Sequence, residues 1–289
     1  MTGTIFIVGC GDIGRRVARQ YLDEGASVSA LVRTPEKAAA LEALGIRTMV
    51  ADLDDPATMA GLPTGGATLF YFAPPPGGGH LDPRARNFCA AIASGAEPAR
   101  VIYMSTSGVY GDCGDTVVTE ETPAIPLTAR GKRRLDAETV FREWGGKRGV
   151  PVVILRVTGI YGPGRLPVSQ LTSGQPVLDE RIANLTNRIH ADDLARVCQA
   201  AAERAEDGDI FNVSDGHPGT ITEYFNAAAA LLGLSRPRQV SWEEAQQVMS
   251  PLMLSYVSES RRMDNRKMLE KLGVTLRYPT LREGITTCR

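Results

Sequence analysis

Short apolar runs alternate with longer amphipathic stretches along the first two-thirds of the chain. The runs are nearly continuously apolar, which is typical of buried parallel strands. They predict strands over residues 4–8, 27–32, 47–50, 68–72, 100–105 and 151–157. The stretches between them predict helices over residues 13–24, 35–44, 83–94 and 129–144, with a short one after Asp55. Repeated strand–helix units predict an α/β fold, a Rossmann-type doubly wound parallel sheet.

The pattern changes after residue 160. Residues 161–176 are rich in loop-forming residues, 192–204 predict a helix, and 210–213 predict a short strand. The last quarter of the chain is helical and irregular in pattern. We therefore expect a Rossmann domain over residues 1–160, its sheet completed by about 188–213, and a smaller C-terminal lobe over 161–289.

Composition and charge narrow the class of protein. The chain has 289 residues, 43% of them hydrophobic and 22% charged, as in an ordinary globular protein. Its net charge of −1 provides no general attraction to nucleic acid or to an anionic membrane. No apolar run is long enough to span a bilayer, and the opening residues enter a strand without a charged leader. We expect a cytoplasmic protein whose partners are small molecules.

The five cysteines predict neither a disulfide framework nor a metal centre. Their number is odd, they are widely spaced, and no Cys-x-x-Cys pair is present. We expect reduced thiols, some of them buried as small apolar residues.

A glycine-rich turn follows the first predicted strand. The sequence Gly9-Cys10-Gly11-Asp12-Ile13-Gly14 links that strand to an amphipathic helix. Glycines at these positions permit a tight turn, a close approach of the backbone to a pyrophosphate, and close packing of helix on strand. The context predicts a dinucleotide site that includes Gly9, Gly11, Asp12, Ile13 and Gly14. The alternative is a tight turn that binds nothing.

The end of the second predicted strand bears on the choice between NAD and NADP. A carboxylate at this point would bind the ribose 2′-hydroxyl of NAD, but the sequence is Leu31-Val32-Arg33-Thr34. Arg33 can pair with a 2′-phosphate instead, which favours NADP over NAD. A solvated arginine at the start of a loop is the alternative.

Two further strand ends lie at the expected crevice. Asp52 and Leu53 follow the third strand and can meet the adenine, and Ala73 follows the fourth, where a small residue admits the cofactor. Each is equally consistent with ordinary sequence at a strand end.

An ordered set of motifs resembles the NAD-dependent epimerase/dehydratase family, the extended short-chain dehydrogenases/reductases. The resemblance covers nearly the whole chain. It rests on GCGDIG, on MSTSGVYGD from residue 104, on a lysine near a helix start, on LRVTGIYGPG from residue 155, on NRIHADDLA from residue 187 and on FNVSDG from residue 211.

The resemblance implies roles for several residues. Thr106 matches the family's hydroxyl that holds the substrate oxygen, with Ser105 and Ser107 as neighbours that could replace it. The family's acid/base is the tyrosine of a Tyr-x-x-x-Lys motif, which we match to Thr128 and Lys132. An aliphatic hydroxyl is too weak an acid to replace a phenol near neutral pH. Thr128 is also well placed as an N-cap, and Lys132 can bind the nicotinamide ribose without a tyrosine.

Substrate would bind between the sheet and the smaller lobe. Ser107, Tyr161 and Arg165 are the candidate substrate-binding residues. Arg188 and the Arg261-Arg262 pair could meet an anionic group, although surface arginines are usually solvated.

Other candidate side chains have plainer structural readings. Tyr110 and Tyr161 match family positions that shape the site, and His190 matches the family's histidine before a helix of the second lobe. His80 lies beside a Pro/Gly-rich loop and could face substrate as a base, although a lone loop histidine is commonly solvated. Asp192 and Asp193 are placed to cap a helix.

The sequence therefore supports two functions. One is an NAD(P)-dependent oxidoreductase or epimerase-like enzyme with an altered acid/base, acting on a small carbonyl, hydroxyl or sugar-like substrate. The other is a catalytically inactive NADP(H)-binding sensor or regulator. The family also implies a homodimer formed through helices 83–94 and 129–144.

Overall fold

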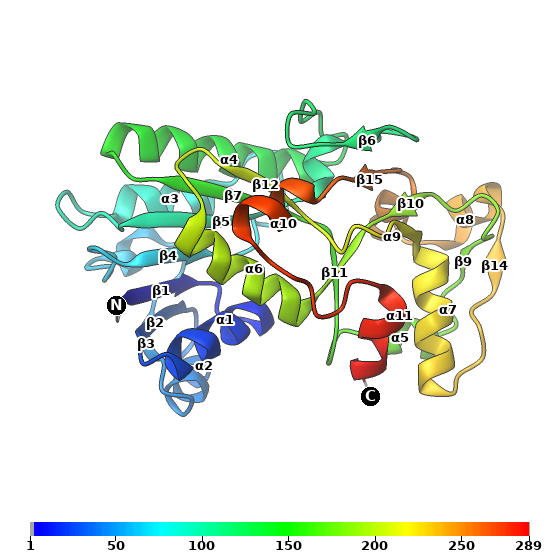
Figure 1. The fold of residues 1–289 in the computed structure, drawn as a ribbon, viewed down its shortest axis with the longest axis horizontal. Coiled ribbons are helices and arrows are strands. Elements are labelled where there is room, and N and C mark those ends of the chain that lie inside the picture. Colours follow the sequence, from blue (N-terminus) through cyan, green and yellow to red (C-terminus); the bar gives the residue numbers. More distant parts are fainter. Residues whose placement is uncertain (1–2, 289) are drawn as a thin grey trace.

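A seven-stranded parallel sheet forms the centre of the computed structural model, which describes residues 3–288 (Figure 1). The strand order is β12-β7-β5-β4-β1-β2-β3. The bounds are β1 Thr4–Val8, β2 Ser27–Val32, β3 Arg47–Val50, β4 Thr68–Tyr71, β5 Arg100–Thr106, β7 Val152–Val157 and β12 Ile210–Val213. The order reverses between β1 and β4, so a topological switch point lies there, as in Rossmann folds. The predicted fold class is confirmed.

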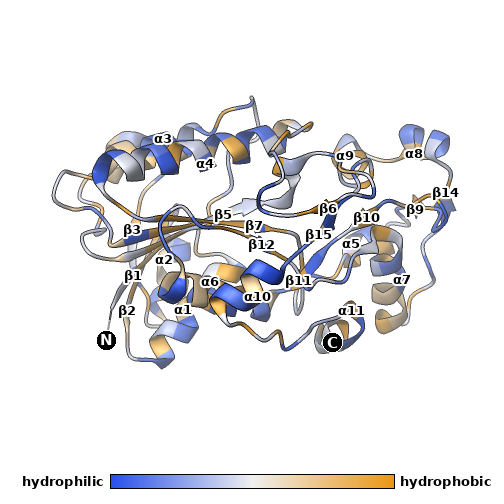
Figure 2. Cartoon of the chain, turned by 45° about the horizontal axis from the view of Figure 1, so that its top comes forward, coloured by the Kyte–Doolittle hydropathy of each residue, from blue (hydrophilic) through white to orange (hydrophobic). Residues whose placement is uncertain are grey.

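Helices cover both faces of this sheet (Figure 1). One face carries α3 Pro83–Ala91 and α4 Ala129–Arg148, and the other carries α1 Asp12–Asp23, α6 Ala191–Arg204 and α10 Arg266–Leu272. Figure 2 shows the apolar strands between the two helical layers. The two largest buried apolar clusters include Phe88 and Phe141 on the α3/α4 face and Val17 and Leu194 on the other face.

The short elements beside the sheet include α2 Pro35–Glu42, η1 Pro56–Met59, η2 Ser107–Tyr110 and β6 Val117–Val118. Strand β12 is the edge strand of the large sheet, next to β7. Strand β11 Arg188–His190 instead pairs with β8 Gly159–Tyr161. The chain thus leaves the sheet after β7 and returns to it, with α6 packed against α1.

The smaller lobe is built from short elements. It contains α5 Val168–Thr172, β9 Val177–Leu178, β10 Leu185–Thr186, β13 Gly219–Thr220, α7 Ile221–Leu232, β14 Gln239–Val240, α8 Trp242–Val248, α9 Pro251–Val257, β15 Arg262–Met263, α11 Leu281–Ile285 and η3 Thr286–Cys288. Strand β15 pairs with β6, so the lobe is tied back to the loop that follows η2.

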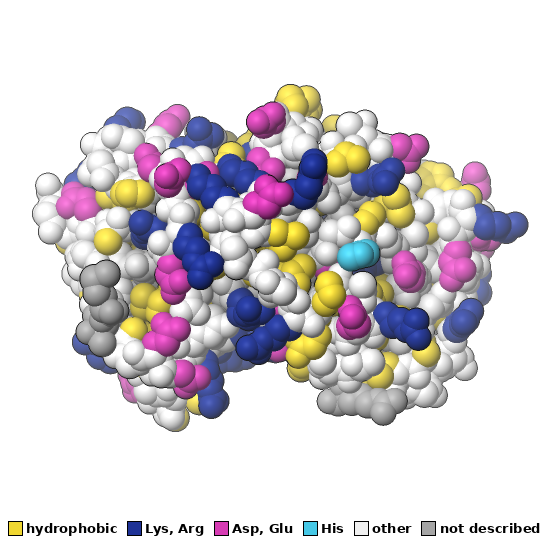
Figure 3. Space-filling view, viewed as in Figure 1, with side chains coloured by type: hydrophobic (Ala, Val, Ile, Leu, Met, Phe, Trp, Pro, Cys, Tyr) yellow, Lys and Arg dark blue, Asp and Glu magenta, His cyan; other side chains and the backbone are white. Residues whose placement is uncertain are grey.

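The surface agrees with the near-zero net charge. On the face in Figure 3, basic and acidic side chains are interspersed. Within residues 3–288, no helix is both long and apolar enough to cross a lipid bilayer. In the same range all five cysteines are free thiols, and no cluster of metal-ligating side chains is present.

Candidate functional site

A groove of about 670 Å³ lies at the carboxyl ends of the strands, at the switch point between β1 and β4. The structure brings nine of the predicted cofactor residues to its wall. These are Gly9, Gly11, Asp12, Ile13, Gly14, Arg33, Asp52, Leu53 and Ala73. Four segments that are distant in sequence therefore meet where Rossmann folds bind dinucleotides.

The first two glycines of the turn have different surroundings. Gly9 has a φ of +90°, and a Cβ there would lie 2.5 Å from the Ala73 nitrogen. That crowding exists because β1 and β4 remain paired to their ends, where the nitrogens of Phe72 and Ala73 both donate to the Val8 carbonyl. Gly11 precedes α1 and has nothing within 4 Å of the corresponding Cβ position. The space in front of the helix N-terminus is open to an anionic group.

Asp12 begins α1 and is held by two arginines. Its carboxylate accepts hydrogen bonds from Arg16 at 3.0 Å and from Arg165 at 2.5 Å. Burial would raise the pKa of Asp12, but these hydrogen bonds outweigh burial and lower it. Arg165 belongs to the loop after β8, so this ion pair joins the smaller lobe to the glycine-rich turn.

The end of the groove beside β2 is cationic. Arg33 after β2, Lys37 in α2 and Arg15 in α1 line it, and all three are exposed. None of the three forms a salt bridge within residues 3–288, so their charges are free to meet a ligand. The side chain of Asp52 accepts from the backbone nitrogen of Asp54 rather than from a cation.

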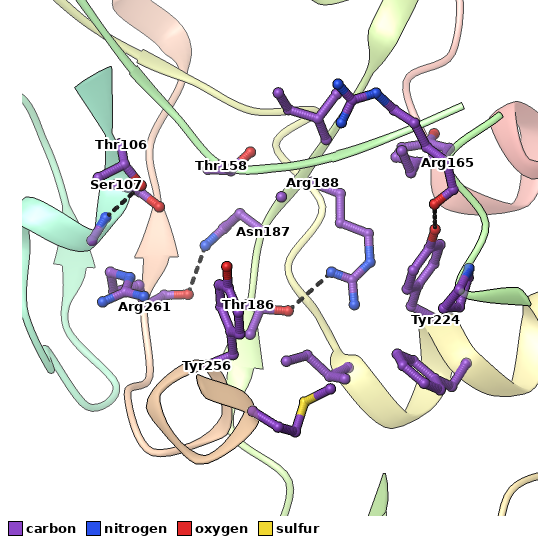
Figure 4. Close-up of a pocket in the computed structure, with 18 of the residues that line it drawn as sticks. Thr106, Ser107, Thr158, Arg165, Thr186, Asn187, Arg188, Tyr224, Tyr256 and Arg261 are labelled. Carbon is purple, nitrogen blue, oxygen red and sulfur yellow. Dashed lines mark hydrogen bonds between the residues drawn. The ribbon is translucent and has the colours of Figure 1, made fainter. Parts of the chain in front are cut away.

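A second cavity, of about 660 Å³, lies between the sheet edge and the smaller lobe (Figure 4). Ile160 and Arg165 line both the groove and this cavity, so the two spaces adjoin. The predicted residues Thr106, Ser107, Tyr161 and Arg165 all line the cavity. The Thr106 hydroxyl accepts from the Gly108 nitrogen at 3.2 Å and can still donate to a ligand. Ser105 is buried and donates to Glu138 instead.

The start of α4 confirms the predicted N-cap role of Thr128, and it places Lys132 away from the predicted site. Thr128 is the N-cap of α4, where its hydroxyl accepts from the Gly131 nitrogen at 3.2 Å. Lys132 is exposed and lines neither the groove nor the cavity. Arg130 and Arg134, four residues apart on one helix face, line the cavity instead. On this helix the structure thus brings Arg130 and Arg134 to the cavity, and not Thr128 and Lys132.

Arg134 lies at the junction of the two spaces. One guanidinium nitrogen donates to the Met104 carbonyl at 2.9 Å and to the Ala73 carbonyl at 3.5 Å. Met104 and Ala73 line the cofactor groove, whereas Arg134 lines the cavity. A cation at this point can contact a ribose in the groove or a ligand in the cavity.

Three tyrosines line the cavity. The Tyr161 hydroxyl donates to the Thr280 carbonyl at 3.1 Å, and the Tyr224 hydroxyl donates to the Arg165 carbonyl at 3.1 Å. Burial raises the pKa of Tyr161 well above its usual range and that of Tyr224 to about 12. Tyr256 of α9 instead extends into the cavity (Figure 4), with its ring 4.0 Å from the Arg130 guanidinium.

Arg188 and Arg261 also line the cavity, whereas Tyr110, His190 and His80 lie outside it. The Tyr110 hydroxyl donates to Asn212 at 2.8 Å, and burial raises its pKa to about 12. His190 is fully buried, and burial lowers its pKa. His190 is also the N-cap of α6, a role that the sequence had suggested for Asp192 and Asp193. His80 is exposed and lines neither space.

Sequence reasoning missed Arg130, Arg134 and Tyr256. The arginine pair carries a weak signal, because basic residues also occupy positions 132 and 133 of the same helix. Tyr256 carries none, since only the tertiary placement of α9 brings it to the cavity.

Known proteins resemble this chain in sequence and in fold. A family model described as NAD(P)H-binding matches residues 9–205. A conserved protein of unknown function from Silicibacter pomeroyi is 30% identical, with a TM-score of 0.81 over 99% of this chain and 97% of the other. UDP-glucose 4-epimerase from Thermotoga maritima, solved with UDP-glucose, is 17% identical with a TM-score of 0.79 over 98% and 96% of the two chains.

Among curated proteins, Escherichia coli protein YeeZ is 31% identical over 141 residues. That match covers 48% of each chain, so it spans about half the length of this relative.

Proposed function

Because the chain belongs to the NAD(P)H-binding family and has the fold of the epimerase/dehydratase-type short-chain dehydrogenases/reductases, we propose that it is an NADP(H)-dependent oxidoreductase. The substrate is a small carbonyl, hydroxyl or sugar-like compound bound in the second cavity. The observation that carries this proposal is the continuity of the two spaces at Ile160 and Arg165.

The residues of the groove fit a phosphorylated nicotinamide dinucleotide. Gly11 leaves room for a pyrophosphate at the N-terminus of α1, and Arg165 can move from Asp12 to that anion. Arg33 and Lys37 can pair with a 2′-phosphate, which supports NADP over NAD. When bound, such a cofactor supplies or accepts a hydride.

Proton transfer needs a group other than a phenol of α4. Tyr256 is the cavity tyrosine without a hydrogen bond from its hydroxyl to another protein group within residues 3–288. The Arg130 guanidinium lies over its ring at 4.0 Å and holds the ring in the cavity. We assign the proton donor to Tyr256, the oxygen-binding donor to Thr106, and the orientation of the nicotinamide ribose to Arg134.

The second candidate function is that of an NADP(H)-binding sensor that does not turn over a substrate. The observation that favours it is the arginine pair of α4, because an arginine cannot exchange a proton near neutral pH.

The test combines binding with turnover. Thermal shifts with NADP⁺, NADPH, NAD⁺ and NADH should show stabilisation, of about 2.7 kcal/mol at 100 times the dissociation constant. NADPH oxidation across a carbonyl panel should then be lost in Y256F. Turnover that survives Y256F refutes the proton donor, and binding without any turnover favours the sensor. The absence of a thermal shift with all four dinucleotides refutes both functions.

A further inference from the structure

The second cavity is lined by five arginines and by no aspartate or glutamate of residues 3–288. Two of the five have carboxylate partners outside the lining, because Arg165 pairs with Asp12 and Arg261 pairs with Glu259. Arg130, Arg134 and Arg188 form no salt bridge within the same range. A cavity lined by three guanidinium groups without salt-bridge partners, and by no carboxylate of the described residues, has a positive potential.

Arg188 is the most deeply buried of the three, with 8% of its surface exposed. Its guanidinium donates to the Thr186 hydroxyl at 3.1 Å and to the Thr220 carbonyl at 2.6 Å, and it lies 4.8 Å from the Tyr224 ring centre. Desolvation by burial lowers the pKa of Arg188. Its hydrogen-bond acceptors are neutral, and Asp215 and Glu223 act on its charge without forming a salt bridge with it. A buried guanidinium without a direct anionic partner is stabilised by an anionic ligand.

Arg130 approaches the cavity from the other lobe. Its Nη1 atom is buried and has no hydrogen-bond partner among the residues that the structure describes. Its guanidinium lies over the Tyr256 ring, which fixes its plane and leaves its edge for other contacts. A buried donor without a partner costs free energy unless an acceptor enters from outside the chain.

We propose that the second cavity is an oxyanion-binding site in which Arg130 and Arg188 hold a carboxylate or phosphate group of the ligand. Three observations on residues 3–288 support this proposal: the cavity lining contains no acidic residue, Arg188 is buried without a salt bridge, and a buried Arg130 nitrogen lacks a hydrogen-bond partner. This inference rests on the proposed function only in placing the ligand beside the cofactor. A planar guanidinium matches both oxyanions through two parallel hydrogen bonds. The ligand is therefore an organic acid or a phosphorylated compound rather than a neutral carbonyl compound.

The arginines of the cavity come from more than one part of the chain. Arg130 and Arg134 place two guanidinium groups on the face of α4 that lines the cavity. A wall of this kind favours a negatively charged ligand over a neutral one. Arg130 and Arg188 come from α4 and β11, so the ligand contacts both lobes.

The test is calorimetric titration of the NADP⁺-saturated protein with inorganic pyrophosphate, with oxalate and with glucose. Saturation with NADP⁺ keeps pyrophosphate out of the cofactor groove. We expect pyrophosphate or oxalate to bind and glucose not to bind, with affinity falling as salt is added. Binding of one anion alone identifies a phosphate or a carboxylate as the ligand group.

The variants are R130Q and R188Q, with R236Q as a control that removes one exposed positive charge from a residue outside the cavity lining. We expect R130Q and R188Q each to weaken anion binding about tenfold or more, because each removes charge-assisted hydrogen bonds. R188K keeps the positive charge and should recover part of the lost anion affinity. It replaces R188Q in the comparison if R188Q folds poorly. The NADP⁺ affinity of all these variants should stay unchanged.

Equal anion affinity in R130Q, R188Q and R236Q overturns the proposal, as does the absence of measurable binding of both anions to the wild-type protein. The same titration without cofactor separates this site from the proposed function. If the protein does not bind NADP⁺ but still binds anions through Arg130 and Arg188, the oxyanion site is supported and the proposed oxidoreductase function is refuted.

Discussion

Gly9 and Gly11 provide a matched pair for separating folding from cofactor binding. In G9A, the new Cβ would lie 2.5 Å from the Ala73 nitrogen at a φ of +90°. The left-handed conformation costs about 1–2 kcal/mol for a residue with a side chain, and overpacking adds about 1–3 kcal/mol. We expect G9A to lower the free energy of unfolding by about 2–5 kcal/mol.

Gly11 has an ordinary φ of −81° and no atom within 4 Å of its Cβ position. G11A should therefore change the free energy of unfolding by less than about 1 kcal/mol. The added methyl group would instead occupy the space in front of α1 that a pyrophosphate needs. A clash of about 1–3 kcal/mol weakens binding about 5- to 150-fold.

The assays are urea denaturation followed by circular dichroism, and calorimetric titration with NADP⁺. The expected pattern is a destabilised G9A and a G11A of normal stability with weakened NADP⁺ binding. The reasoning is refuted if G11A binds NADP⁺ as tightly as the wild-type protein. It is also refuted if G11A is destabilised as much as G9A, since the open space at Gly11 would then be wrong.

Three further variants probe the surroundings of the site. E138Q removes one charge of a buried pair in which Arg156 donates to Glu138 at 2.8 Å, and urea denaturation should show a loss of about 3–5 kcal/mol; a loss below about 1 kcal/mol would contradict burial of the pair. Burial raises the pKa of Asp215 to about 6, so the folded protein favours the protonated carboxyl. The stability that this protonated group contributes is fully present below about pH 4 and is lost as the pH rises through 6. D215N should accordingly gain about 2–3 kcal/mol relative to the wild-type protein between pH 4 and pH 7, and a pH-independent difference would refute the shift. T128A should lower the free energy of unfolding by about 1 kcal/mol through loss of the N-cap, and it should leave NADP⁺ affinity unchanged. K132A should change neither the free energy of unfolding nor the NADP⁺ affinity. A large fall in NADP⁺ affinity in either variant would favour the assignment of Thr128 and Lys132 made from the sequence.

The sequence predicts the sheet well because burial on both faces leaves continuous apolar runs. The predicted strand over residues 4–8 coincides with β1, and the predicted helix over 129–144 begins where α4 begins. The glycine-rich turn is equally clear in the sequence, because a tight turn and a close backbone approach are local requirements that only glycine meets well.

The face of α4 that lines the cavity was harder to predict. Basic residues occupy positions 130, 132, 133 and 134, so composition does not reveal which face meets the cavity. The face is set by packing, since a Cβ at Gly131 would lie 2.5 Å from the Gly108 carbonyl and Glu138 pairs with Arg156. The smaller lobe was predicted only in outline, because its short elements owe their placement to tertiary contacts.

The measurement that tests the account most directly is a crystal structure of the protein with NADP⁺. The account predicts the pyrophosphate at the N-terminus of α1, the 2′-phosphate beside Arg33 and Lys37, and the nicotinamide ribose within hydrogen-bond distance of Arg134. A dinucleotide bound elsewhere, or a nicotinamide ribose that contacts Lys132 while Arg134 remains remote, would contradict it.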